Sequence, residues 1–519
     1  MIVSQESVID IPLVLLIVHQ SLIEFLKVKD ALSLFSISRS LAYGARRSVI
    51  RDANVKVPAT CSIHDLKNRF KDIIFYIRSI QLPLAEDSSL ELTLPIFPQL
   101  TRLIASHLVN LNILKVLDQL IELDLGARSY SFTNNTDLID LEIVTNLSQL
   151  ASLRVNNIAI CSLIPISKLL SLETLSFYFS ADSSLDLTQL EMLRKLKDLE
   201  ISGRGLREVA PLSHITSLNT LCISDTNVSD VSSLSRLGEL NHLSITRCPL
   251  SDIQPLSCLN NLTKLDLSES ALSDVSPLSK LMSLRDLNVS LTFVAEITTF
   301  STLSQLQHLN ISHTYVDDLA AVSGMNILRT LLLDGTGVNS LRPLSTLQNL
   351  RVLSFNETKV QNVNPLESIT SLVVLSAIAT DIKDISPLSA LTNLKELYLS
   401  QTRVPEISPL RNLEKLEILH LSGLWILDFS SLNTTPRLRE LHLSVLKESN
   451  ISSLASLLEL IVLHIGVGHF GDMKGFKLDV IKCLQKLEFL YLHGAKGYDM
   501  GNLCDWMDKN NVEFLDWRK

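Results

Sequence analysis

Five flat, polarisable side chains recur at one repeated position near the end of this 519-residue chain: Tyr398, His420, His442, His464 and Tyr491. The first four are spaced by 22 residues. Rings in one exposed line are typical of a protein-binding surface. Another interpretation is that His tolerates a crowded sheet and was copied with the repeat. Imidazoles also bind metals, but no carboxylate or Cys shares their repeat position, so we predict no metal site here.

The same pattern predicts how the three imidazoles should titrate. If neighbouring strands stack in register, the rings of His420, His442 and His464 lie about 5 Å apart. Two charged rings at that distance repel each other, so we expect the three to titrate as a coupled group. His442 has a His on either side and should therefore be the hardest to charge.

A 22-residue unit must position these rings. Thirteen copies begin with Leu, from Leu196 to Leu460. Each opens with L-x-x-L and another apolar residue two places later, which predicts a short strand with one buried face. Apolar residues at positions eleven, fourteen, seventeen and twenty then favour a tight 3₁₀ turn. No unit can bury its own leucines, so neighbouring units must stack.

Two further columns of the repeat support this interpretation. Pro at position sixteen opens a helical turn well because its φ is fixed. It occurs in seven units: Pro211, Pro255, Pro277, Pro343, Pro365, Pro387 and Pro409. A buried Thr hydroxyl can hydrogen-bond the turning backbone, so we expect a structural role for the Thr at position nine. This Thr also occurs in seven units: Thr226, Thr292, Thr314, Thr336, Thr358, Thr380 and Thr402.

Residues such as LTKLDLSESALSDVSPLSKL and LKELYLSQTRVPEISPLRNL resemble leucine-rich repeats of the 22-residue type. This type is found in phosphatase-1 regulatory leucine-rich proteins and in bacterial internalins, where position nine is often Asn. The resemblance implies an α/β leucine-rich-repeat solenoid, a curved horseshoe with a parallel concave sheet and short 3₁₀ or helical convex turns. It also implies a protein-interaction scaffold or regulatory protein that binds a protein ligand on its concave face.

The first 50 residues lack the repeat, and their apolar spacing predicts a small helical module. The run Ile11–Val18 is preceded by Glu6 and Asp10 without a basic residue, which argues against a signal peptide. It is also too short to span a bilayer, so we predict no membrane span.

This N-terminal module resembles an F-box, although the acidic residue usual after the Pro is missing. The residues that carry the resemblance include Ile11, Pro12, Phe25, Leu26 and Leu32. The resemblance implies docking on a Skp-type adaptor, so the alternative function is a substrate receptor of a cullin ubiquitin ligase. The other interpretation is a plain helical cap over the first repeat.

The chain is thus expected to divide into the helical module at 1–50, a linker at 51–76 and the solenoid at 77–519. The Trp506 segment and the final strand-like VEFLDW predict a C-terminal cap.

Composition limits the function classes. A net charge of −9 and a pI near 5.8 give no basic footprint for nucleic acid. Seven Cys without a C-x-x-C pair favour a reducing compartment, so we expect an intracellular protein, cytoplasmic or nuclear. No nucleophile elbow, phosphate loop or metal-spaced cluster occurs, so we predict neither an enzyme nor a cofactor.

Overall fold

The computed structural model describes eleven stretches of the chain. They are residues 54–56, 78–82, 97, 99–105, 111–125, 141–160, 162–178, 186–446, 449–467, 478–493 and 503–516. The expected module at 1–50, with Ile11, Pro12, Phe25, Leu26 and Leu32, lies outside them. The chain divides into two units, Met1–Leu240 and Asn241–Lys519.

The first unit is a run of parallel strands, each paired with the next, and short turns between them. Its strands are β1 (Asn54–Lys56), β2 (Ser79–Leu82), β3 (Arg102–Ala105), β4 (Glu122–Asp124), β5 (Ser152–Ala159), β6 (Thr174–Tyr178), β7 (Asp198–Ser202) and β8 (Thr220–Ser224). Its turns are η3 (Leu111–Val116), η4 (Glu142–Asn146), α5 (Ile164–Ser167), η5 (Leu187–Met192), η6 (Ala210–His214) and η7 (Ser232–Arg236). Strand β1 lies within the segment expected as a linker and pairs with β2.

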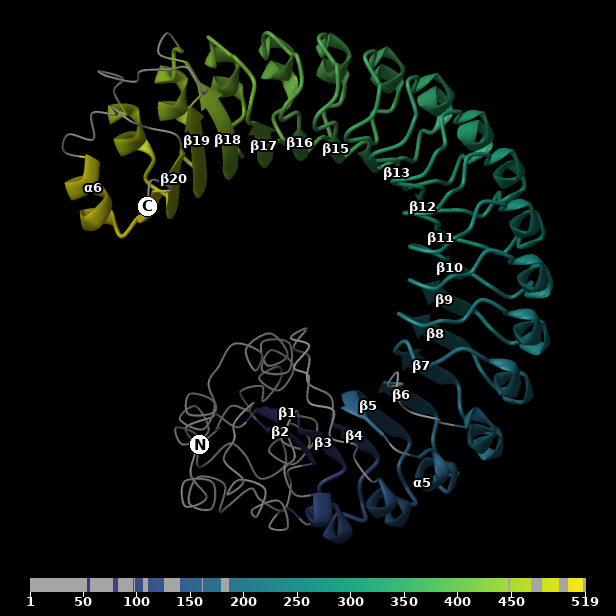
Figure 1. The fold of residues 1–519 in the computed structure, drawn as a ribbon. Coiled ribbons are helices and arrows are strands. Elements are labelled where there is room, and N and C mark those ends of the chain that lie inside the picture. Colours follow the sequence, from purple (N-terminus) through teal and green to yellow (C-terminus); the bar gives the residue numbers. More distant parts are fainter. Residues whose placement is uncertain are drawn as a thin grey trace, which may run out of the picture. The chain divides into compact units, whose positions relative to one another are not determined.

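The second unit repeats the same arrangement, with strands on its inner side and turns on its outer side (Figure 1). Its strands are β9 (His242–Thr246), β10 (Lys264–Asp266), β11 (Asp286–Asn288), β12 (His308–Asn310), β13 (Thr330–Leu332), β14 (Val352–Ser354), β15 (Val374–Ser376), β16 (Glu396–Tyr398), β17 (Ile418–Leu421), β18 (Glu440–Val445), β19 (Val462–Val467), β20 (Phe489–His493) and β21 (Glu513–Asp516). Its turns are η8 (Gln254–Cys258), η9 (Ser276–Lys280), η10 (Thr298–Thr302), η11 (Ala320–Gly324), η12 (Arg342–Thr346), η13 (Asn364–Ser368), η14 (Ser386–Ala390), η15 (Ser408–Asn412), η16 (Ser430–Thr434), η17 (Ser452–Ser456), η18 (Asp479–Cys483) and the helix α6 (Leu503–Asn510).

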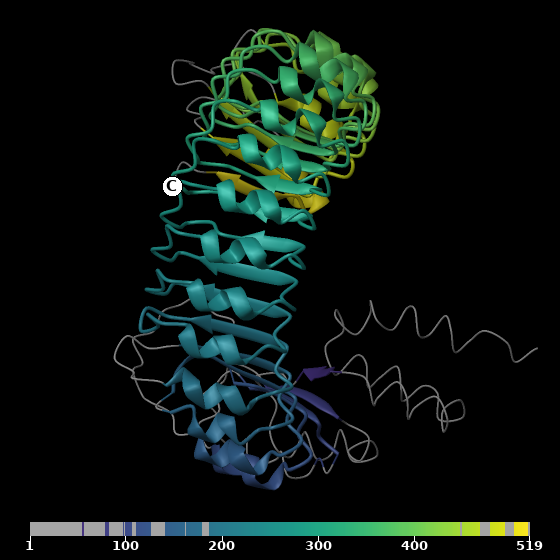
Figure 2. The ribbon, with the colours of Figure 1, turned by 90° about the vertical axis from the view of Figure 1, so that its right-hand side faces the viewer.

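Identical repeat positions stack directly on one another in the second unit. Leu331 pairs with Leu309 on one side and Leu353 on the other, and all three side chains are buried. Figure 2, seen from the side of the turns, shows the turns stacked in a row in front of the strands. The core is therefore a column of leucines between the sheet and the turns, as the period-2 pattern predicts.

The 3₁₀ turns and the Thr column confirm the sequence interpretation. In η12, the amide of Leu344 donates to the carbonyl of Leu341 at 2.9 Å, and Pro343 lies in the first turn. Thr358 is buried, and its Oγ1 donates to the carbonyl of Phe355 at 2.7 Å. The same bond recurs at Thr292, Thr314, Thr336, Thr380 and Thr402. The hydroxyl thus satisfies a carbonyl where the chain leaves the sheet.

Position eight of the repeat has a left-handed backbone, which the sequence pattern does not reveal. Eight non-Gly residues there have φ between 53° and 59°: Asp225, Arg247, Glu269, Leu291, His313, Glu357, Ala379 and Gln401. Gly335 occupies the same position at φ 62°, and a Cβ there would lie 2.3 Å from His313 Nδ1. The turn geometry is therefore imposed by the stacked repeat, against a backbone preference of about 1 kcal/mol per residue.

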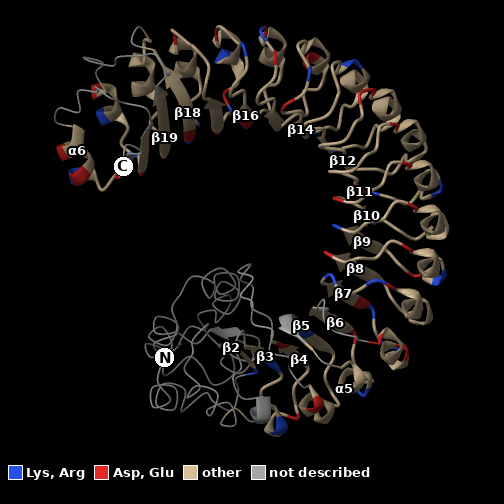
Figure 3. Cartoon of the chain, viewed as in Figure 1, with Lys and Arg blue, Asp and Glu red and all other residues tan. Residues whose placement is uncertain are grey.

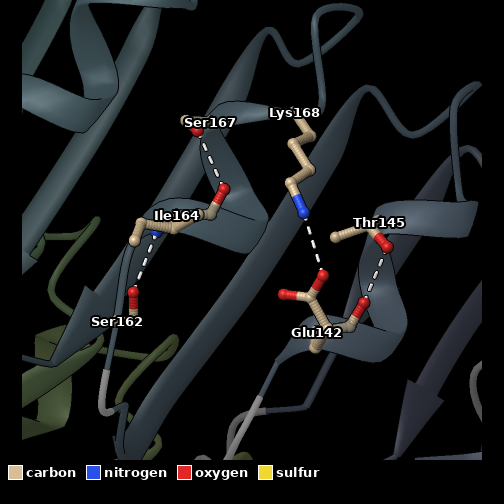
Figure 4. Close-up of polar contacts among 6 residues, drawn as sticks. All are labelled: Glu142, Thr145, Ser162, Ile164, Ser167 and Lys168. Carbon is tan, nitrogen blue, oxygen red and sulfur yellow. Dashed lines mark hydrogen bonds and ion pairs between the residues drawn. The ribbon is translucent and has the colours of Figure 1, made fainter.

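Surface contacts also join neighbouring repeats in the first unit (Figure 4). Lys168, directly after α5, reaches Glu142 in η4 with its Nζ 2.9 Å from Oε1. The hydroxyls of Thr145 and Ser167 donate to carbonyls three residues earlier, at Glu142 and Ile164. Both members of the ion pair are exposed, so the pair adds little stability.

The segment expected as a C-terminal cap forms a helix and a strand at the end of the second unit. Helix α6 contains Trp506, buries Leu503 and Met507, and contacts η18. Strand β21 then pairs with β20. Trp517 lies outside the described residues.

The leucine column gives a stability prediction with a neighbour as its control. Leu331→Asp should cost about 3 kcal/mol or more, because it leaves an unpaired charge in a site with no exposed surface. Leu332→Asp places the same charge on the half-exposed opposite face and should cost much less. Urea unfolding followed by circular dichroism compares the two midpoints. Equal effects would contradict the assignment of inward and outward strand positions.

Candidate functional site

The five residues of the predicted ring column come from five consecutive strands, β16 to β20. Direct register pairs join Tyr398 to His420, His420 to His442, His442 to His464 and His464 to Tyr491. All five side chains are half-buried. Successive side chains of a strand point to opposite faces of the sheet, and each ring follows a buried leucine directly. The column therefore lies on the side of the sheet opposite to the leucine core.

The rings touch in a continuous line. Tyr398 meets His420 edge-on, with centroids 4.7 Å apart. The rings of His420 and His442 stack at 3.9 Å, and those of His442 and His464 at 5.1 Å. Tyr491 lies 6.1 Å from His464 and is tilted against it. These separations agree with the spacing expected from the stacked strands.

A carboxylate that the sequence analysis missed lies between two of these imidazoles. Glu440 Oε1 is 2.9 Å from His420 Nε2 and 3.0 Å from His442 Nε2. Glu440 precedes His442 by two residues on β18, so both side chains project from the same face. The acid lies at position three of the strand and not at position five, the repeat position that the rings share. The sequence feature that could have revealed this contact is a Glu two residues before a His on the same strand.

A second carboxylate at position three, that of Glu396, contacts the tyrosine at one end of the ring column. Tyr398 Oη donates to Glu396 Oε2 at 2.9 Å. Burial, this bond and the charges of Glu396 and Glu440 raise the pKa of Tyr398 to about 12. The phenol therefore stays protonated and acts as a hydrogen-bond donor at neutral pH.

The middle imidazole is held in its neutral form. Burial of the ring is the largest cause that lowers the pKa of His442, to about 4, and the neighbouring His420 and His464 add to it. The Glu440 carboxylate opposes this shift without overcoming it. The expected difficulty of charging His442 thus has its main cause in desolvation, with repulsion between imidazoles second.

The earlier strands of the second unit carry polar groups that bond to one another. Asn288 Nδ2 donates to Asp266 Oδ2 at 3.1 Å, and Ser354 Oγ donates to Asp334 Oδ1 at 2.6 Å. In these contacts the polar side chains of neighbouring repeats satisfy each other's hydrogen-bonding groups. Figure 3 shows positive and negative residues interspersed along the described elements, so neither sign dominates this sheet.

An exposed aromatic pair lies at position ten, which the sequence analysis did not single out. Phe293 and Tyr315 are 57% and 67% exposed and stack with centroids 6.3 Å apart. Trp425 occupies position ten of a later unit and is 52% exposed. The second unit therefore also carries exposed aromatic rings outside the column.

Comparison with known proteins identifies the architecture. Residues 294–510 match the family model described as a leucine-rich repeat region. An internalin from Listeria monocytogenes is 25% identical, with 60% of this chain and 89% of that chain covered and a TM-score of 0.53. The fold is a leucine-rich-repeat solenoid. A leucine-rich-repeat protein of Leptospira interrogans gives a TM-score of 0.59 at 18% identity, covering 68% of this chain and 91% of that one.

A third solved structure is similar over a longer stretch of this chain. It is a TLR13–ssRNA13 complex, 18% identical with a TM-score of 0.55, and the match covers 85% of this chain and 64% of that chain. No curated protein matches the chain significantly. Within the described part of this leucine-rich-repeat solenoid, no helix has the length and apolar character needed to cross a membrane.

The burial of His442 predicts a low titration midpoint. Its ring should protonate near pH 4 instead of its ordinary 6.5, because burial and two adjacent imidazoles disfavour the charged form. NMR of protein labelled at histidine, without added metal, measures this midpoint, and His442→Asn assigns the signal. Glu440→Gln removes the opposing carboxylate and should lower the midpoint further. A midpoint at 6.5 or above would contradict this account of the site.

Proposed function

We propose that this protein is an interaction scaffold or regulatory protein that binds a protein ligand on the strand face of its second unit. The observation that carries the proposal is the unbroken line of five half-buried rings on β16 to β20. Aromatic side chains are enriched among the residues that dominate binding energy at protein interfaces. The leucine-rich-repeat fold supports the proposal, since stacked repeats create extended concave binding surfaces.

The length of the column limits what can lie along it. Five strands about 4.8 Å apart span roughly 19 Å. An extended segment of about six residues or a helix of about thirteen residues covers that length. Each ring projects from a strand paired on both sides, so little conformational entropy remains to be lost on binding. A ligand with apolar side chains along such an element matches the rings, and a ligand cation can meet Glu396 or Glu440.

The two terminal tyrosines test this surface. Tyr398→Ala and Tyr491→Ala should each weaken ligand binding about tenfold or more, because each removes an aromatic anchor from the line. A partner captured by affinity purification and cross-linking is identified by mass spectrometry, purified, and titrated against each variant by calorimetry.

Two control variants localise the effect. Asn310→Ala lies at position five of β12, away from the rings, and Lys280→Ala lies on the outer turn η9; both should bind as the wild type does. Unchanged affinity of both tyrosine variants would exclude the ring column as the binding surface.

The alternative function uses the N-terminal residues. The pattern Ile11, Pro12, Phe25, Leu26 and Leu32 supports an F-box-type module that docks a Skp-type adaptor, with the repeats selecting the substrate. In this proposal the protein acts in the cytoplasm or nucleus, where its seven Cys stay reduced.

Deletion of residues 1–50 separates the two functions. In the F-box proposal, purified Skp-type adaptor binds the full chain, and the truncated chain loses the adaptor while keeping its ligand on the ring column. Leu26→Asp in the full chain provides the matched point variant. Analytical gel filtration of the mixtures gives the readout. A full chain that does not bind the adaptor would refute the F-box, and aggregation of the truncated chain would indicate a cap.

A further inference from the structure

We propose that His420, Glu440 and His442 form a binding site for a transition-metal dication, with Zn²⁺ the best match. The structure brings together two imidazole nitrogens and one carboxylate oxygen from the adjacent strands β17 and β18, and the three atoms lie within 4.8 Å of one another. This assignment revises the expectation of no metal, which rested on position five alone.

The distances suit tetrahedral coordination. In a tetrahedral zinc site with bonds of about 2.0–2.1 Å, neighbouring ligand atoms lie about 3.3 Å apart. Both Nε2 atoms already lie 2.9–3.0 Å from the same Glu440 oxygen. Each Nε2 atom therefore needs to move away from that oxygen by only a few tenths of an ångström to admit the ion, and the two Nε2 atoms lie within 4.8 Å of each other.

The donor chemistry selects the class of metal. Two neutral imidazoles and one carboxylate are the ligand set of many zinc sites, whereas Mg²⁺ and Ca²⁺ prefer oxygen ligands throughout. The neutral form of His442, favoured by its burial, is the form that coordinates a metal without first losing a proton.

One rearrangement is needed before the metal can bind. The rings of His420 and His442 stack with their planes 19° apart, and a metal lies in the plane of each imidazole that binds it. The two rings must therefore tilt out of this stack so that both lone pairs converge. Their side chains are 21% and 27% exposed, which leaves room for that rotation on the solvent side of the sheet.

Three protein ligands leave a fourth coordination position. The ring column faces away from the leucine core, so this position is open to water or to a donor from a bound ligand. The metal site does not depend on the proposed protein ligand, because the metal can be tested with the purified chain alone.

The test is calorimetric titration of the full-length protein with ZnCl₂ after removal of metals by a chelator. We expect one Zn²⁺ per chain in the wild type. Loss of a hydrogen-bond partner behind a ligand lowers metal affinity about 10–100-fold, so Glu440→Gln and His442→Asn, which each remove a ligand itself, should lower it by about 100-fold or more. The same variants should lose the increase in melting temperature that Zn²⁺ gives the wild type. Circular dichroism without metal confirms that each variant is folded, and His420→Asn replaces any variant that is not.

His214 and Glu191 provide the matched control. Their Nδ1 and Oε1 atoms lie 3.0 Å apart, the same kind of contact with a single imidazole, so His214→Asn should bind Zn²⁺ as the wild type does. A wild-type chain without stoichiometric Zn²⁺ binding would overturn the proposal. Equal affinity of the wild type and the Glu440 and His442 variants would also overturn it, since the ion would then lie elsewhere. MgCl₂ should give no binding at this site.

Discussion

The structure depends on one constraint, which is that each repeat must bury its leucines against the next repeat in the same register. Leu309, Leu331 and Leu353 pair directly and are excluded from water. A shift of one residue would turn the buried face of a strand toward solvent, so the register is strongly specified. Every position of the 22-residue unit consequently stacks on its own copy. Side chains on the sheet face opposite to the leucine core form columns, in which neighbours lie about 4.8 Å apart.

This constraint explains which parts of the structure can be predicted from the sequence. The strand leucines, the Pro that opens a turn and the Thr that satisfies a carbonyl each have a fixed place in the repeat and a single physical role. Strand β1 could not be predicted, because three residues outside the repeat carry no periodic signal. The left-handed position eight was also hidden, since Leu291 and His313 occupy a conformation that their residue types do not favour.

The ring column was predicted residue by residue, but its chemistry was only partly predicted. The repeat shows which residues share a position, and so it placed His420 beside His442. It does not show which residues of different positions meet, and Glu440 reaches both imidazoles from position three. That contact depends on side-chain rotamers across two strands. The low pKa of His442 likewise depends on burial of the ring together with His420, Glu440 and His464 from three strands.

Stacking identical polar or charged side chains in one column is energetically unfavourable, and the chain offsets this in two ways. Along the earlier strands of the second unit, some carboxylates accept hydrogen bonds from amides or hydroxyls of neighbouring repeats, as Asp266 does from Asn288 and Asp334 from Ser354. Along β16 to β20, rings replace these groups, and one carboxylate lies between two imidazoles. A neutral imidazole has one N–H, so Glu440 can accept hydrogen bonds from both rings only if each presents that N–H at Nε2. When the proton of each neutral ring is carried at Nδ1 instead, the same two Nε2 atoms present a lone pair and become metal ligands. The cluster can therefore exist in a hydrogen-bonded or a metal-bound state, and the partly open face of the sheet allows the exchange between them.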